Sequence, residues 1–154
     1  MKEITLYTDG SSKGNPGPGG LGVVLIYNGN KKEIAKGFRL TTNNRMELSA
    51  VIEGLAALKE PCKVTVYTDS KYIVDAFGKG WIDNWLNSNW VKKDKKPVLN
   101  VDLWQKLLEL MEQHDVTFQW VKGHASNPVN NRCDELAVSA ASGKNLLVDE
   151  GYKA

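Results

Sequence analysis

The chain has 154 residues, 20 of them Lys or Arg and 18 Asp or Glu, so its formal net charge is only +2. This length fits one domain that buries roughly 70% of its unfolded surface, and so mild a charge does not by itself indicate a nucleic-acid-binding protein. Cys62 and Cys133 form no C-x-x-C pair, which favours free thiols in a reducing compartment over disulfides or a zinc site. Because the sequence contains no long apolar run and no secretory pattern, we expect a cytoplasmic protein without a membrane span.

The first forty residues predict three strands. Residues 4–9 alternate apolar and polar side chains, and residues 21–27 form a nearly continuous apolar run. Residues 31–40 follow an Asn28-Gly29 pair, which is typical of a hairpin turn. The run TDGSSKGNPGPGG between the first two strands predicts a loop, and it lacks the G-x-x-x-x-G-K-[ST] spacing of a phosphate-binding P-loop. The three strands are expected to form an antiparallel meander.

The rest of the chain alternates helices with two more strands. Apolar residues at helical spacing predict a helix with Asn43 or Asn44 as N-cap that ends before Pro61. Strands are expected at 63–69 and 115–121, with two short helices at 70–77 and 81–88 and a longer one at 101–113, capped by Asn100, between them. A last helix covers residues 130–143 and stops at Gly143, and the tail after about 143 is expected to be flexible.

This order of elements predicts an α/β fold in a single domain, residues 1–154. The sheet has five strands in the order 3-2-1-4-5, with strands 1, 4 and 5 parallel and helices on its faces. The first and fourth strands both end in YTD. If these strands are neighbours, Asp9 and Asp69 lie side by side at the carboxyl edge of the sheet, where α/β folds bind their ligands.

Two further carboxylates reach the same edge. Glu47 lies in the first turns of the helix after strand three, and Asp134 lies early in the last helix. Four clustered carboxylates raise each other's pKa values and need a cation, and an all-oxygen set suits Mg²⁺ or Mn²⁺ better than zinc. Two such ions about 4 Å apart activate water and stabilise the leaving oxygen of a phosphodiester. Singly, each residue also fits a turn or a helix end, so it is their convergence that favours a metal site.

The two histidines have different interpretations. His124 lies in the loop before the last helix, at the same edge, where it is suited to move a proton during water attack or product release. His114 ends a helix, where C-terminal capping explains it without any chemistry.

Several motifs in order resemble bacterial type 1 ribonuclease H over almost the whole chain. They are YTDGSSKGNPGPGG, TTNNRMEL, YTDS, a tryptophan-rich stretch ending in DKKPV, NVDLW, and WVKGHA with NRCDELA. The resemblance implies the ribonuclease H-like fold and hydrolysis of the RNA strand of RNA–DNA hybrids, which leaves 5′-phosphate and 3′-hydroxyl ends and removes RNA primers and R-loops. It implies His124 as the loop histidine and one or two Mg²⁺ ions, with Mn²⁺ as a substitute. The implied ligands are Asp9, Glu47, Asp69 and Asp134.

The resemblance also implies contacts to the hybrid. Asn15 and Thr42 match positions that hold a DNA phosphate, and Asn43 and Asn44 match positions that reach the minor groove. Trp81 matches a tryptophan that packs on DNA sugars, while core packing is expected for Trp85, Trp90, Trp104 and Trp120. Backbone groups that read 2′-hydroxyls, the mark of RNA, are implied at Gly10 and Ser11.

A basic, helical protrusion is implied around residues 81–98. It holds the duplex through its phosphates, although the same stretch taken alone also fits a solvated charged loop. Its WLNSNW segment is neutral where many relatives are basic, so weaker hybrid binding is expected, and Lys71 after YTDS receives no role. The basic residues of the protrusion are Lys92, Lys93, Lys95 and Lys96.

Three other classes fit parts of this pattern. Integrases, transposases and junction resolvases share the fold, but they lack the protrusion and the loop histidine. A hybrid-binding module without catalysis would have lost a carboxylate, and a metal-free ribonuclease would need His114 beside His124. The retained carboxylates favour an enzyme, which we expect to be a monomer. A partnership with a single-strand-binding protein remains open, since no motif indicates it.

Overall fold

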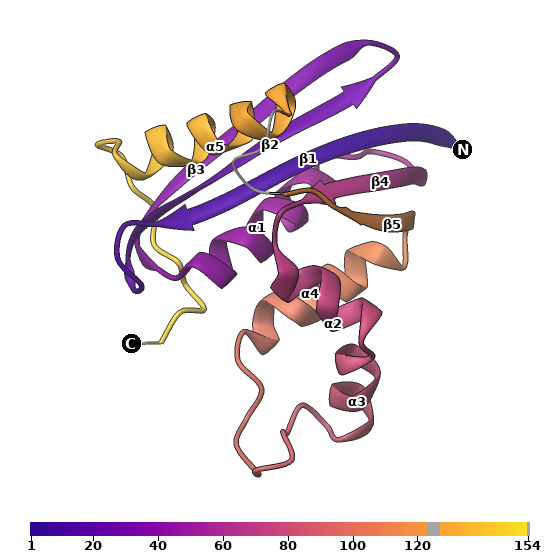
Figure 1. Ribbon diagram of the computed structural model, residues 1–154, viewed down its shortest axis with the longest axis vertical. Coiled ribbons are helices and arrows are strands. Elements are labelled where there is room, and N and C mark those ends of the chain that lie inside the picture. The colour runs from indigo at the N-terminus through magenta and orange to yellow at the C-terminus, as the bar shows by residue number, and fades with distance from the viewer. Residues whose placement is uncertain (123–126, 154) are drawn as a thin grey trace.

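The fold is a five-stranded mixed sheet with helices on both faces (Figure 1). It is taken from a computed structural model that describes residues 1–122 and 127–153. The strand order is β3-β2-β1-β4-β5, as the sequence predicts, with the first three strands antiparallel and β4 and β5 parallel to β1. The strands are β1 (Lys2–Ser12), β2 (Gly17–Tyr27), β3 (Asn30–Thr41), β4 (Cys62–Thr68) and β5 (Asp115–Trp120).

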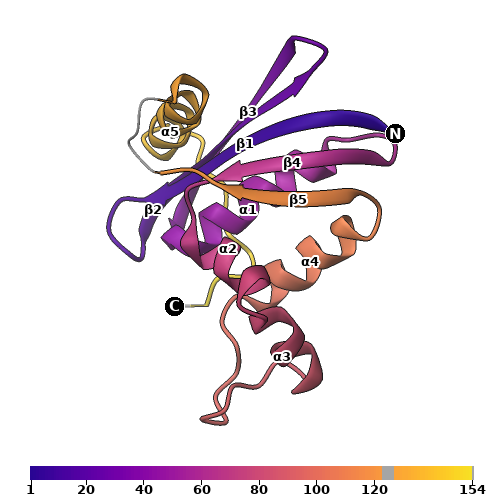
Figure 2. The ribbon, with the colours of Figure 1, turned by 45° about the vertical axis from the view of Figure 1, so that its right-hand side comes forward.

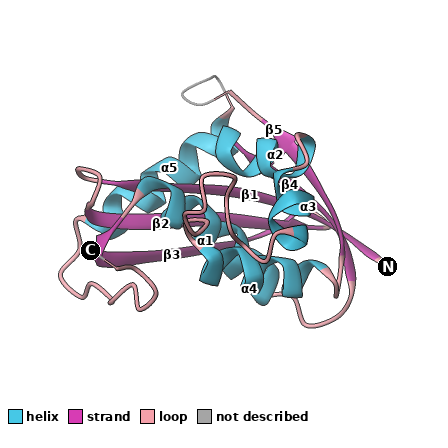
Figure 3. Cartoon of the chain, turned by 90° about the horizontal axis from the view of Figure 1, so that it is seen from below, coloured by secondary structure: helices cyan, strands magenta, loops and turns pink. Residues whose placement is uncertain are grey.

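The helices form two unequal layers. One face of the sheet carries α5 (Pro128–Ala141), and the opposite face carries α1 (Asn43–Ala56) with α4 (Val101–Met111) against it (Figure 2). Seen from below, α1, α3 and α4 lie in front of the sheet (Figure 3). The helices α2 (Lys71–Gly78) and α3 (Trp81–Asn87) follow β4, and α3 and the loop after it project away from the sheet as a protrusion (Figure 1). None of the described helices is long and apolar enough to cross a membrane.

The main core lies between the sheet and α1. Leu6 of β1 and Val66 of β4 are fully buried on this face, where they meet Val51 and Leu55 of α1. Trp104 of α4 is also fully buried and closes the core from below. Burial of each such side chain contributes roughly 1.5–3 kcal/mol, so this layer holds α1 in a fixed position on the sheet.

Both cysteines pack inside the fold. Cys62 and Cys133 are buried free thiols, as expected from their spacing. Burial raises the pKa of the Cys133 thiol to about 12, so this residue behaves as a small apolar group on the buried side of α5.

The predicted loop over the glycine and proline run is wrong for most of its length. β1 continues to Ser12 and β2 already begins at Gly17, so the glycines of the run other than Gly14 lie in paired strands. A Cβ atom on Gly22 would lie 2.2 Å from the carbonyl oxygen of Cys133, so only glycine lets α5 rest on the strand here. We call this contact the glycine seat of α5, and it comprises Gly20, Gly22 and Gly37.

The ends of the helices differ from the sequence prediction by a few residues. The N-cap of α1 is Thr42, whose hydroxyl accepts from the N–H of Arg45, rather than Asn43 or Asn44. α5 begins at Pro128 instead of residue 130, because Asn127 caps it and proline suits the first helical position. Asn100 does take the N-cap position of α4, but its side chain makes no capping bond.

The segment after α5 makes specific contacts that do not support a flexible tail from residue 143. The backbone N–H of Leu147 donates to Gly37 and its carbonyl accepts from Arg39. Asp149 accepts from the hydroxyl of Thr41 at 2.7 Å and from the buried Arg45 at 2.7 Å and 2.9 Å. The chain therefore lies against β3 and α1 as far as Asp149.

The guanidinium of Arg45 also joins α1 to α4. It donates to both carboxylate oxygens of Asp102 at 2.9 Å and 2.8 Å, and these hydrogen bonds lower the pKa of Asp102. One buried cation thus links the starts of two helices and the C-terminal segment.

Candidate active site

Asp9 and Asp69 are neighbours at the carboxyl edge of the sheet, as the shared YTD triplets predict. The parallel register of β1 and β4 pairs Tyr7 with Tyr67, whose rings stack at 4.7 Å, and each aspartate follows two residues later. The prediction that Asp9 and Asp69 are neighbours, on which the rest of the site depends, is confirmed.

Glu47 reaches Asp9 because α1 lies very close to β1. A Cβ atom on Gly10 would lie 2.3 Å from the carbonyl carbon of Met46, so the helix backbone rests directly on this glycine. The N–H of Gly10 donates to Glu47 Oε1 at 2.5 Å. One carboxylate oxygen each from Asp9, Glu47 and Asp69 all lie within 4.8 Å of one another.

Asp134 arrives from the other face of the sheet. Gly22 pairs directly with Asp9 in the register of β1 and β2, and Gly22 belongs to the glycine seat on which α5 rests. Asp134 therefore lies beside Asp9 and lines the same pocket, although it is not part of the group of three whose oxygens lie within 4.8 Å.

The four carboxylates share one pocket of about 320 Å³. Its remaining walls come from the end of β1, the first turn of α1, the start of α2 and the first turns of α5, so four separated parts of the chain meet here. The other residues that line it are Gly10, Ser11, Asn43, Asn44, Ser70, Lys71, Tyr72, Asn130 and Asn131.

The electrostatics of the pocket oppose ionisation of Asp9 and Glu47. Burial, followed by the charges of Asp69 and Asp134, raises the pKa of Asp9 to about 8. Burial, followed by the charges of Asp9 and Asp69, holds the pKa of Glu47 well above its ordinary value. All the donors are carboxylate oxygens, the preferred ligands of a hard divalent cation, so the residues present fit such an ion.

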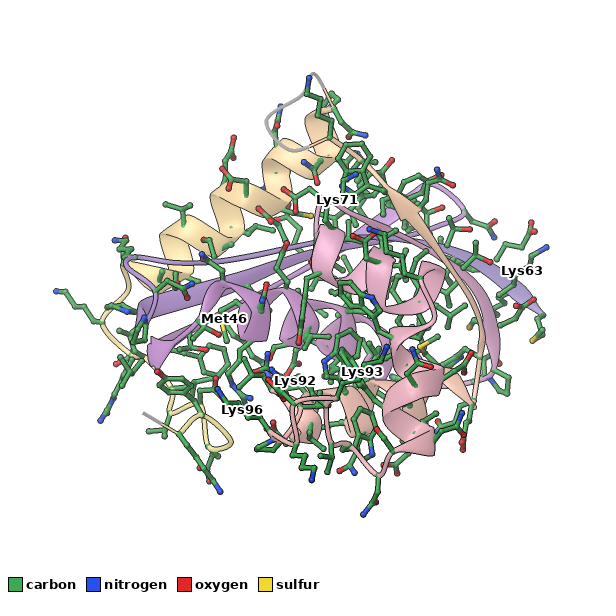
Figure 4. The ribbon with its side chains drawn as sticks, turned by 60° about the horizontal axis from the view of Figure 1, so that its bottom comes forward. Met46, Lys63, Lys71, Lys92, Lys93 and Lys96 are labelled. Carbon is green, nitrogen blue, oxygen red and sulfur yellow. The ribbon has the colours of Figure 1, made fainter. Side chains whose placement is uncertain are left out.

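Asp69 is held by contacts from β5. The indole N–H of Trp120 donates to the carbonyl oxygen of Asp69 at 3.2 Å, and the N–H of Val121 donates to Thr68 at 2.9 Å. The ammonium of Lys71 lies over the Trp120 ring, 4.4 Å from its centroid, at the rim of the pocket (Figure 4). Trp120 is 38% exposed, so the expectation of core packing is wrong for this tryptophan.

The residues implied to grip the hybrid lie beside the acidic pocket. Asn15 Oδ1 accepts from the N–H of Asn43, and Asn43 Oδ1 accepts from the N–H of Ser12, which fixes the turn between β1 and β2 against the start of α1. Asn44 lines both the acidic pocket and a second groove of about 440 Å³. This groove is also lined by Asn15, Thr42, Leu99, Gly151, Tyr152 and Lys153.

The protrusion contains a third pocket, of about 450 Å³. Trp81 and Trp85 of α3 line it together with Lys92 and Lys93 from the following loop, so aromatic faces and cations are combined as the resemblance implies. Lys96 lies on the same loop, where the N–H of Lys92 donates to its carbonyl (Figure 4).

The structure describes one of the two histidines. Nδ1 of His114 accepts from the N–H of Cys62 at the start of β4. The side chain therefore has a structural role, as expected, but it binds the backbone of β4 rather than capping the preceding helix as predicted. His124 lies outside the described residues, and its role in proton movement stays a prediction.

An α/β sheet with clustered carboxylates at its carboxyl edge is typical of enzymes that act on phosphodiesters with a divalent ion. The family model described as RNase H matches residues 1–142. The chain therefore belongs to the RNase H family, and it is a nuclease that hydrolyses the RNA strand of RNA–DNA hybrids.

Relatives and solved structures agree with this assignment. A ribonuclease H from Desulforamulus reducens is 58% identical over 149 residues, which are 97% of this chain and 94% of the relative. A ribonuclease H from Pseudoalteromonas atlantica is 57% identical, and the match covers 99% of this chain and 99% of the relative. Among solved structures, LC9-RNase H1 superposes with a TM-score of 0.83 at 34% identity, over 98% of this chain and 79% of that one. LC11-RNase H1, solved in complex with an RNA/DNA hybrid, has a TM-score of 0.69 at 30% identity, over 90% and 96% of the two chains.

Proposed function

We propose that the acidic pocket binds two Mg²⁺ ions, with Mn²⁺ as a substitute, and cleaves the RNA strand to leave 5′-phosphate and 3′-hydroxyl ends. The proposal is carried by the group of three carboxylates whose oxygens lie within 4.8 Å of one another. When bound, the ions supply an activated water and stabilise the leaving oxygen.

The side chains of the pocket have distinct tasks in this proposal. Asp9, Glu47, Asp69 and Asp134 would hold the ions. Asp9 lies between Asp69, which follows the neighbouring strand β4, and Asp134 on α5. Glu47 is oriented by the N–H of Gly10, and Asp69 by the contacts of its backbone with Trp120. Trp120 and Gly10 thus fix the carboxylates before substrate arrives, which reduces the reorganisation needed during the reaction.

In this proposal the DNA strand follows the second groove and the pocket of the protrusion. The second groove presents Asn15 and Thr42 to a phosphate, and the protrusion presents Trp81 to a sugar and its lysines to further phosphates. Gly10 and Ser11 lie on the floor of the acidic pocket, where 2′-hydroxyls of the RNA strand pass. The enzyme would act as a monomer in the cytoplasm on RNA primers and R-loops.

The decisive assay offers end-labelled RNA–DNA hybrid, duplex RNA and duplex DNA to the protein in Mg²⁺. We expect cleavage of the RNA strand of the hybrid alone and its loss in EDTA. Asp9→Asn and Asp69→Asn should each reduce kcat by at least about 10³-fold, because a neutral amide is a poor replacement for a carboxylate between two cations.

Two results would contradict the proposal. One is cleavage that persists in EDTA, and the other is a wild-type rate in either variant. Ca²⁺ in place of Mg²⁺ provides a further check, since an ion that binds carboxylates in a looser geometry should support binding of the hybrid without rapid cleavage.

A further inference from the structure

Asn130 stands out among the buried polar side chains. It lies in the first turn of α5, it is 2% exposed, and among the described residues its Oδ1 is the buried side-chain atom without a hydrogen-bond partner. A buried acceptor without a partner costs about 1–3 kcal/mol, so native proteins rarely retain one without a reason.

The position of Asn130 indicates that reason. It lies one helical turn before Asp134 and lines the acidic pocket with Asp9, Glu47 and Asp69. Its backbone is fixed, because Asn127 Oδ1 accepts from the N–H groups of Val129 and Asn130, both at 3.1 Å. Asn130 is therefore a fixed part of the pocket wall.

The donor that Oδ1 needs is absent from the neighbouring carboxylates. Carboxylates that hold a cation can only accept hydrogen bonds, so neither Asp9 nor Asp134 can then supply this donor. Mg²⁺ retains several water molecules when it binds carboxylates, and those waters carry protons to donate. The pocket, at about 320 Å³, has room for several of them.

We propose that Asn130 is a positioning residue for the metal site, whose Oδ1 accepts a hydrogen bond from a water molecule that a bound Mg²⁺ retains. The residue thus holds the ion indirectly, and it strengthens ion binding without contributing a charge. This inference rests on the proposed function, since it needs the acidic pocket to hold a divalent ion. Groups that orient metal ligands in this way typically change metal affinity or activity by about 10- to 100-fold when removed.

The test measures Mg²⁺ binding directly, with no substrate present, by calorimetry and by the rise in unfolding temperature when Mg²⁺ is added. Asn130→Ala should bind Mg²⁺ about 10- to 100-fold more weakly, while its unfolding temperature in metal-free buffer changes little. Asn130→Asp keeps an acceptor at the same place and adds a charge. It should therefore bind Mg²⁺ at least as tightly as the wild type, but unfold at a lower temperature without the ion.

Two controls separate the possible explanations. Asn145→Ala removes an exposed carboxamide outside the pocket and should leave Mg²⁺ binding unchanged. Wild-type Mg²⁺ affinity in Asn130→Ala overturns the inference, and so does a loss of metal-free stability without a loss of affinity. If Asp9→Asn is inactive while Asn130→Ala behaves as the wild type, only this inference fails; if Asp9→Asn retains cleavage, the proposed function itself fails.

Discussion

At the scale of single residues, Asp9 shows how the pocket depends on a cation. Burial and neighbouring charges raise its pKa from the ordinary value of 3.8 to about 8. Between these two values the metal-free native protein retains a proton that the unfolded chain releases. The stability that this proton provides is fully present below about pH 4 and is lost as the pH rises through about 8.

We therefore expect the unfolding temperature of the metal-free protein to fall as the pH rises from about 4 to 8. For one proton the slope is at most about 1.4 kcal/mol per pH unit. Asp9→Asn should flatten this dependence, and saturating Mg²⁺ should do the same in the wild type, because a bound cation favours the ionised form. Thermal unfolding monitored by circular dichroism at several pH values provides the measurement. The idea fails if Asp9→Asn and the wild type show equal slopes.

At the scale of elements, two glycines determine where the carboxylates lie. Gly10 lets α1 approach β1 and brings Glu47 to the edge, and Gly22 lets α5 approach β2 and brings Asp134 beside Asp9. Neither glycine contributes a side chain. The geometry of the site is therefore set by backbone contacts between helix and sheet.

Gly22→Ala tests the glycine seat of α5. The added methyl group would meet the carbonyl oxygen of Cys133, so α5 must shift, and we expect a loss of about 1–3 kcal/mol in stability together with weaker Mg²⁺ binding. Gly78→Ala is the matched control, because no atom lies within 4 Å of its added methyl group. This helical position should gain about 0.4–1 kcal/mol. Equal behaviour of the two variants in urea unfolding would contradict the role of the seat.

The same elements show what the sequence could and could not predict. The YTD triplets and the order of strands and helices were enough to place Asp9, Asp69, Glu47 and Asp134 at one edge, because parallel strands and right-handed crossovers leave few arrangements. The sequence did not predict how far β1 and β2 extend into the glycine run. A glycine run has the same composition whether it lies in a loop or in a strand covered by a helix, and only the position of α5 distinguishes the two.

The contact of Trp120 with Asp69 and the burial of Asn130 in the pocket wall also escaped prediction. Trp120 reads as one apolar position of a strand, and its bond to the carbonyl of Asp69 depends on the pairing of β5 with β4. In the sequence alone, Asn130 is an ordinary polar residue near the start of a predicted helix. Its burial follows from the close approach of α5 to the sheet, which periodicity does not encode. The signal available was the spacing of four between Asn130 and Asp134, which places both on one helix face.

At the scale of the whole molecule, basic residues are concentrated in one loop, although the net charge of the chain is small. The chain carries only +2 overall, yet the loop after α3 carries four lysines within five residues. This loop projects from the sheet together with α3 (Figure 1). Local charge of this kind strengthens binding to a duplex mainly through its phosphates, which makes binding sensitive to salt.

Replacing the four lysines of the protrusion by alanine should raise KM for the hybrid, leave kcat nearly unchanged and flatten the dependence of KM on salt. The logarithmic slope should fall by up to about 3.6, since each of the four phosphate contacts contributes about 0.7–0.9. The matched control replaces four other lysines by alanine, so that it removes the same charge. These lysines lie just before β4 or at the strand ends opposite the acidic pocket. An unchanged slope in the first variant would show that its lysines are simply solvated. The control lysines are Lys31, Lys32, Lys59 and Lys63.

The course of the C-terminal segment has a practical consequence for handling the protein. Because Asp149 is tied to Arg45, the residues that follow run into the second groove, where Tyr152 and Lys153 face the positions proposed to hold a DNA phosphate. The N-terminus lies well away from this end of the chain (Figure 1). An affinity tag or fusion partner joined at the C-terminal end would therefore emerge beside the substrate path, whereas the same tag placed before β1 would leave that path open.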